Sequence, residues 1–222
     1  MEILGIVEKR AFWPLFFPFF STGFYYIFLF PSSRLHHVFL PLMVSIVTLG
    51  LWFSRNSERS EDLCLRKKGA IRAVFLGIAG GLGLGLFNLF VIVKLTPWLG
   101  YSNEFLRETP HADLSLWIMF PFGILLISFL IEILFRGWIL GRFLSVFRST
   151  RGGSCWAVLL SALYFSFDPF MVVYFKGYHW LALTDGIIWG ALLLKTGNLF
   201  SSISAHTVEV WIVYLVLKVF YA

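Results

Sequence analysis

Residues 70–93 read AIRAVFLGIAGGLGLGLFNLFVIV, and this stretch decides the fold class of the chain. A helix needs roughly 20 apolar residues to cross the hydrocarbon core of a bilayer. The segment is long and apolar enough to do so. A strand of a membrane barrel would instead alternate apolar and polar residues. The segment is therefore predicted to be a transmembrane helix.

Further apolar stretches of similar length lie on both sides of this segment. The predicted spans are residues 11–30, 36–53, 70–93, 114–135, 154–175, 179–195 and 198–220. Pro14 and Pro18 should leave the first span kinked or partly interfacial, and the fifth is expected to break at Asp168-Pro169. The expected fold is an all-α polytopic membrane protein of about seven helices, with residues 1–222 forming a single membrane domain.

The composition excludes a soluble globular domain. Hydrophobic residues make up 59% of the 222 residues and charged residues 14%, whereas a soluble domain carries about 25% charged residues. The mean hydropathy is +0.82. The chain has too little polar surface to cover itself in water, so the lipid bilayer is its expected solvent and first partner.

The net charge of +6 does not indicate a nucleic-acid partner, because the basic residues lie mainly between apolar runs. Short loops rich in Lys and Arg stay cytoplasmic. Two such loops are predicted, and they carry Arg55, Arg59, Arg66, Lys67 and Lys68 in one and Arg136, Arg142, Arg148 and Arg151 in the other. With Lys9 and Arg10 they place the N-terminus in the cytoplasm and the C-terminus outside, in a membrane of the bacterial inner (plasma) membrane type. An eighth or re-entrant helix would reverse only the C-terminus.

The third predicted span carries a ridge of glycines at Gly77, Gly81 and Gly85. Small residues at this spacing let a second helix approach closely in a membrane, so we expect the ridge to be a helix-packing surface. The string of glycines at 80–85 is not a dinucleotide loop, since it lies inside an apolar span with no preceding strand. Nothing else in the chain indicates a cofactor, and Cys64 and Cys155 indicate neither a disulfide framework nor a metal knuckle.

Ionisable residues inside spans cost about 2.5–3.5 kcal/mol each on insertion scales and therefore tend to mark function. The chain carries five at such depths, with one cation near an interface: Glu132, Asp168, Asp185, His206 and Glu209, with Arg136.

These residues include two pairs whose spacing would place both members on one helix face. Glu132 and Arg136 are four residues apart, which fits either a structural ion pair or an acid tuned by its neighbouring cation. His206 and Glu209 are three apart. A zinc site would need about three protein ligands. No second histidine has helical spacing to His206, and His36, His37 and His179 fall at a predicted outer interface. No metal is therefore expected.

The strings EILFRG at 132–137 and GALLLKTGNLFSSISAH at 190–206 resemble the CPBP family, also called the Abi family. These intramembrane proteases include the type II CAAX prenyl endopeptidases. The family pattern is a Glu-Glu-x-x-x-Arg-Gly helix, a Phe-x-x-x-His helix, and a Thr-Gly-Ser/Asn-Leu turn before a helix with His-x-x-x-Asn. The resemblance covers about residues 114–215 and implies a CPBP-type core over 114–220, preceded by N-terminal helices over 1–113.

The catalytic positions of the family are mostly replaced in this chain. In the family the first glutamate and the second-motif histidine are thought to activate a water, and the last histidine and asparagine to steady the oxyanion. Here the first glutamate position is Ile131 and the asparagine position is Val210, while Asp168 or Pro169 falls where the second-motif histidine should be. Glu132, Arg136 and His206 are retained. The resemblance therefore implies the fold more directly than the activity.

Three functions fit these residues. The preferred one is a catalytically impaired pseudoprotease that serves as a scaffold or binding subunit for a membrane helix or lipidated peptide. The alternative is an intramembrane endopeptidase with a reworked acid site, in which Glu132 and Asp168 activate water opposite His206. Arg136, Asp185 and Glu209 would support either site. A transporter or proton-relay component is a third reading, since buried acids also mark ion paths.

Overall fold

The computed structural model describes residues 13–30, 37, 39–55, 60–103, 115–175 and 178–220 of the chain. Over these residues every regular element is a helix. The main α-helices are α2 (Phe16–Phe24), α4 (Leu40–Arg55), α5 (Ala70–Phe90), α9 (Ile124–Glu132), α10 (Leu140–Val146), α11 (Gly153–Ser166), α12 (Pro169–Phe175), α13 (Trp180–Thr196) and α14 (Phe200–Phe220).

Short π-helical and α-helical segments join several of these into longer helices. The π-helix η5 (Val91–Leu95) and α6 (Thr96–Trp98) extend α5 into one helix over Ala70–Trp98. The segments α8 (Leu116–Ile118) and η7 (Met119–Gly123) lead into α9, and η8 (Ile133–Ile139) joins α9 to α10.

The helix that carries Glu132 has a sharp kink before α9. Phe120 has φ −109° and ψ 121°, whereas its neighbours are helical. It precedes Pro121, whose ring disfavours the helical conformation for the residue before it. The kink therefore has a local cause in the sequence.

Among the described residues, two helices are long and apolar enough to cross a membrane, Ala70–Trp98 and Ile124–Val146. Shorter apolar helices cover Leu40–Arg55, Gly153–Ser166 and Phe200–Val216. An all-helical membrane architecture is thus supported, whereas the count of seven spans stays a prediction. The expected break in the fifth span is present, since α11 ends at Ser166 and α12 begins at Pro169.

The expected boundary of the fourth span at residue 135 was wrong. The helix continues through η8 and α10 to Val146, so Arg136 and Arg142 lie inside the bundle, each 1% exposed, rather than in a loop. The Arg142 guanidinium carbon lies 5.3 Å from the centre of the Trp52 ring and 5.8 Å from that of Trp138. Aromatic faces attract a buried cation, which is why a helix can retain this arginine. The loop that follows keeps only Arg148 and Arg151 of the four basic residues assigned to it.

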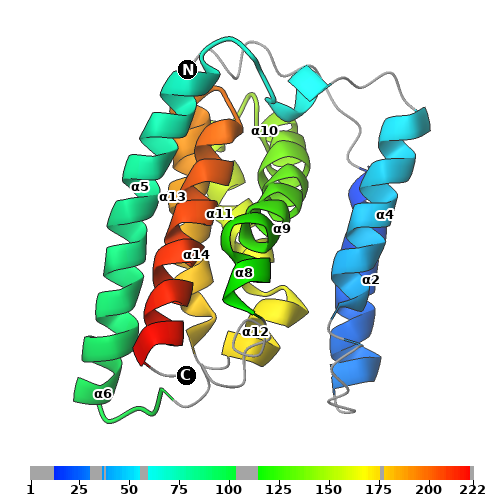
Figure 1. Cartoon of the computed structure of the whole chain (residues 1–222). Helices are drawn as coiled ribbons and strands as arrows, with labels where there is room; N and C mark the ends of the chain where they lie inside the picture. The colour runs from blue at the N-terminus through cyan, green and yellow to red at the C-terminus, as the bar shows by residue number, and fades with distance from the viewer. Residues whose placement is uncertain are drawn as a thin grey trace.

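Figure 1 shows α5, α13, α14, α11 and the α9–α10 helix gathered into one bundle, with α2 and α4 paired at its other side. Helix α5 lies along α14, and its three ridge glycines face that helix. A Cβ added at Gly77 would meet the Ser201 carbonyl oxygen, and one at Gly85 would lie 2.9 Å from a methyl group of Ile212. The glycines allow the two longest α-helices to pack backbone against backbone.

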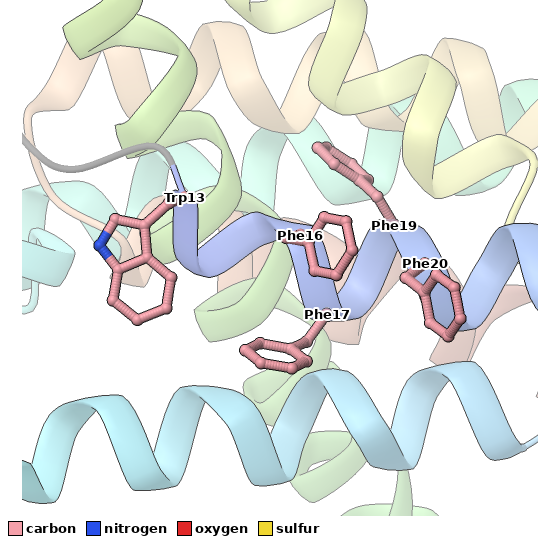
Figure 2. Close-up of a pocket in the computed structure, with 5 residues that line it drawn as sticks. All are labelled: Trp13, Phe16, Phe17, Phe19 and Phe20. Atoms are coloured by element: carbon pink, nitrogen blue, oxygen red, sulfur yellow. The ribbon is translucent and has the colours of Figure 1, made fainter.

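The N-terminal pair is attached to the bundle by aromatic and polar contacts. The Phe19 ring lies 4.7 Å from the Tyr164 ring, edge to face. The Tyr26 hydroxyl donates a hydrogen bond of 2.7 Å to the Phe167 carbonyl at the end of α11. Figure 2 shows Phe19 on the side of α2 away from α4, and Phe17 pointing toward α4.

The other aromatic residues at the start of α2 are largely exposed. Trp13, Phe16, Phe17 and Phe20 are each more than half exposed, and with Phe19 they line an open hollow of about 580 Å³ (Figure 2). An aromatic surface of this kind is costly in water and favourable against lipid. It therefore agrees with the membrane assignment from composition.

Candidate active site

The helix formed by α9 and η8 supplies the acid and the arginine of the site. The Arg136 Nη1 atom lies 3.4 Å from Oε1 of Glu132, and the two side chains are 1% and 0% exposed. The spacing of four residues places both groups on one helix face. The ion pair expected from the sequence is thus formed, and it is fully enclosed.

Helix α14 brings His206 to the same carboxylate. The His206 Nδ1 atom lies 2.9 Å from Glu132 Oε1, across 74 residues of sequence. The imidazole stacks on the Trp189 indole of α13, with ring centres 4.0 Å apart and planes inclined by 14°. Stacking fixes the ring plane, and the hydrogen bond fixes which nitrogen faces the acid.

Aromatic rings also enclose the guanidinium of Arg136. Its central carbon lies 4.5 Å from the centre of the Phe165 ring and 4.9 Å from that of Trp189. The backbone of Gly186 passes on another side, because a Cβ there would lie 2.9 Å from Nη2. Glycine at this position therefore makes room for the arginine. Trp189 and Phe165 were not recognised from the sequence, where they read as ordinary apolar residues.

Some polar atoms of this site have no hydrogen-bond partner among the described residues. They are Oε2 of Glu132 and both terminal nitrogens of Arg136, and all are buried. Buried polar groups usually find a protein partner or an ordered water. Oε2 of Glu132 and the terminal N–H groups of Arg136 therefore keep hydrogen-bonding capacity that the described side chains do not use.

A second polar cluster lies beside the first. The side-chain amide of Asn88 in α5 donates two hydrogen bonds, one of 3.0 Å to Oδ1 of Asp185 and one of 2.9 Å to Oε1 of Glu209. All three side chains are less than 9% exposed. Neither Asn88 nor its contact with Asp185 was predicted from the sequence. The sequence feature that could have identified Asn88 is its polar carboxamide inside the apolar span 70–93.

Asp168 lies apart from both clusters. Its carboxylate accepts a hydrogen bond of 3.0 Å from the Phe170 backbone N–H, which caps the start of α12. Within the described part of the chain it has no hydrogen bond or ion pair with Glu132 or His206. The chain leaves helix α11 at Ser166, before the position where the family histidine would stand, and so the aspartate serves a turn.

The other two replaced positions, Ile131 and Val210, lie in apolar surroundings. Ile131 belongs to the main hydrophobic core. Val210 packs near Met119, Ile124 and Tyr214. Among the described residues, no group of three His, Cys, Asp or Glu side chains is placed to hold a metal ion. The arrangement that remains is an acid held between an arginine and a histidine in an apolar bundle.

These features define a helical membrane bundle with a buried Glu–Arg–His site. Residues 113–212 match the family model described as type II CAAX prenyl endopeptidase Rce1-like. This part of the chain is therefore similar to the Rce1-like members of the CPBP family, which confirms the resemblance drawn from the sequence. No curated protein and no solved structure matches the chain.

Proposed function

We propose that this membrane protein uses its Rce1-like domain for binding rather than for cutting peptide bonds. The domain acts as a scaffold or binding subunit that holds a membrane helix or a lipidated peptide. The partner occupies the face that in active relatives receives the substrate.

The observation that carries this proposal is the enclosure of Glu132. A general base must reach the proton that it removes, directly or through one water. Glu132 is 0% exposed, and its Oε1 atom is shared by His206 and Arg136. The first-glutamate and asparagine positions hold Ile131 and Val210, which can neither take a proton nor donate a side-chain hydrogen bond. What is retained suits internal structure better than turnover.

An intramembrane endopeptidase with a reworked site is the second candidate. It is favoured by Oε2 of Glu132 and the terminal nitrogens of Arg136, which make no hydrogen bond to a described residue. A water between them would face a carboxylate base, and the guanidinium would offer N–H donors to an oxyanion. In this version Glu132 acts without Asp168, whose carboxylate caps α12.

The Glu132→Gln variant distinguishes the two candidates. Glutamine keeps the size and most hydrogen bonds of glutamate but removes the base. We expect neither wild type nor variant to cleave a prenylated CAAX peptide, and both to capture the same membrane partner by crosslinking in native membranes. A protease would instead lose about 10²–10⁴-fold in rate. Asp168→Asn is the matched acid-to-amide control, and wild-type cleavage abolished in Glu132→Gln but kept in Asp168→Asn would establish the second candidate.

We also infer that the end of the bundle that holds the start of α5 and the end of α13 is cytoplasmic. Those two segments lie together, because the Asn198 amide donates a hydrogen bond of 2.7 Å to the Arg66 carbonyl. The same end carries Lys67, Lys68 and Lys195, and Figure 1 shows the end of α10 there as well. Because Arg136 and Arg142 lie inside the bundle, fewer Lys and Arg residues lie at this end than the sequence suggested. Those that remain still favour the cytoplasmic side for it.

Cysteine labelling tests this orientation. In a chain whose native Cys64 and Cys155 are changed to alanine, Lys67→Cys and Arg148→Cys should stay unlabelled by an impermeant maleimide in intact cells. Tyr101→Cys, at an exposed residue beyond α6, should be labelled. Labelling of Lys67→Cys from outside would contradict the orientation.

A further inference from the structure

The cluster of Asn88, Asp185 and Glu209 is not part of the Glu–Arg–His site, and its charges are not balanced. Three carboxyl groups lie together in the bundle, with Glu132, Asp185 and Glu209 at 0%, 8% and 6% exposure. The fixed cation at this depth is Arg136, which interacts electrostatically with Glu132 and with Asp185. Uncompensated charge is costly in an apolar interior. A further positive charge is needed.

The position of the guanidinium decides which carboxyl group needs that charge most. Its Nη2 atom lies against Gly186, the residue next to Asp185. Glu209 instead lies near the carboxyl group of Asp185 and accepts the hydrogen bond of the Asn88 amide. His206, on the same face of α14, is committed to Glu132 at 2.9 Å. Of the three carboxyl groups, Glu209 is thus the one to which the described residues bring no cation.

The amide of Asn88 supplies an independent observation. Its nitrogen donates to both carboxyl groups, but its carbonyl oxygen Oδ1 is buried and has no donor among the described residues. A carboxylate cannot satisfy that oxygen, since an ionised acid only accepts. A protonated carboxyl group has one O–H donor. An acid and an amide can then pair through two parallel hydrogen bonds.

We propose that Glu209 is a proton-binding site that holds its proton at neutral pH, paired with Asn88, while Asp185 stays ionised beside Arg136. The bound ligand is a proton. Glu209 accepts from the Asn88 nitrogen through Oε1 and donates from Oε2–H to Asn88 Oδ1. This leaves one guanidinium between two carboxylates, with Asn88 and His206 donating to them. The assignment is independent of whether the Glu132 site is catalytic.

Infrared spectroscopy of the protein in nanodiscs tests the assignment directly. The wild type at neutral pH should show the carbonyl stretch of a protonated carboxylic acid, shifted in D₂O, and the band should disappear as the pH is raised. Glu209→Gln should remove that component, because the remaining Asp185 is ionised. Asp185→Asn should retain it. Absence of the band in the wild type would overturn the proposal, and so would an unchanged band in Glu209→Gln.

Stability measurements separate a proton from a metal cation. Glutamine resembles a protonated glutamate in shape and charge, so Glu209→Gln should melt close to the wild type at neutral pH. The wild-type melting temperature should fall as the pH rises and Glu209 loses its proton, and Glu209→Gln should lack that dependence. A rise in the wild-type melting temperature with Na⁺ or Ca²⁺ at fixed pH, together with loss of the infrared band, would instead make the carboxyl pair a metal-cation site and refute the proton assignment.

Discussion

Gly81→Leu should leave little folded protein in membranes, whereas Gly83→Leu should fold as the wild type does. A Cβ at Gly81 would lie 2.5 Å from the Ala205 carbonyl oxygen and 2.9 Å from Cβ of Val208. Real Cβ atoms do not approach a backbone oxygen that closely, so α5 and α14 would have to separate. Overpacking costs about 1–3 kcal/mol where side chains can adjust, and more is expected where backbone must move.

The two glycines form a matched pair, because they lie on the same helix two residues apart. A Cβ at Gly83 would meet nothing within 4 Å. Both substitutions add the same side chain and remove the same backbone freedom, so a difference between them reports the contact with α14. Folded yield and melting temperature in detergent measure it. Equal behaviour of the two variants would show that the glycine ridge does not hold the helices together.

Separation of α5 from α14 would also disturb the second polar cluster. Asn88 reaches Asp185 and Glu209 only because α5 lies close to both α13 and α14. The Gly81→Leu variant is therefore expected to lose the protonated-carboxyl band assigned to Glu209, even where some protein remains helical. Gly83→Leu should keep it.

Much of the architecture followed from the sequence, because apolar runs and motif spacing are local properties. The glycine ridge at Gly77, Gly81 and Gly85 identified a packing face, and the spacing of Glu132 and Arg136 identified an ion pair. The break at Asp168-Pro169 followed from proline chemistry. Residues 190–206 identified the family through a turn and a histidine at fixed separation.

The remaining features depend on contacts between distant segments. The end of the fourth helix was misplaced because arginine was read as a loop residue, whereas Arg142 is enclosed by Trp52 and Trp138 from two helices. Asp168 was considered as a possible partner of Glu132 because of its position in a motif, but helix α11 ends before it and its carboxylate caps α12. Asn88 lies outside the family segment, and only the packing of α5 on α14 brings it to the acids. A single sequence gives no such pairings.

Arg136→Ala should destabilise the protein by about 3–5 kcal/mol, the cost of removing one partner from a buried ion pair. A typical protein has about 5–15 kcal/mol of stability in total, so the variant should be at the edge of folding. The guanidinium interacts with Glu132 and Asp185 and stacks near Phe165 and Trp189. Removing it leaves two carboxylates without a cation and a cavity among aromatic rings. Thermal unfolding in detergent measures the loss, with Arg151→Ala at an exposed arginine as the control.

The double substitution Glu132→Leu with Arg136→Met separates lost charge pairing from lost volume. Replacing a whole buried ion pair by apolar residues is often neutral or stabilising, whereas breaking it is not. The double variant should therefore be more stable than Arg136→Ala, although Asp185 still lacks its cation. Adding Asp185→Asn should recover further stability, since the asparagine amide is neutral and needs no cation. If Arg136→Ala were as stable as the wild type, the buried ion pair of Glu132 and Arg136 would not stabilise the fold, and the prediction would be wrong.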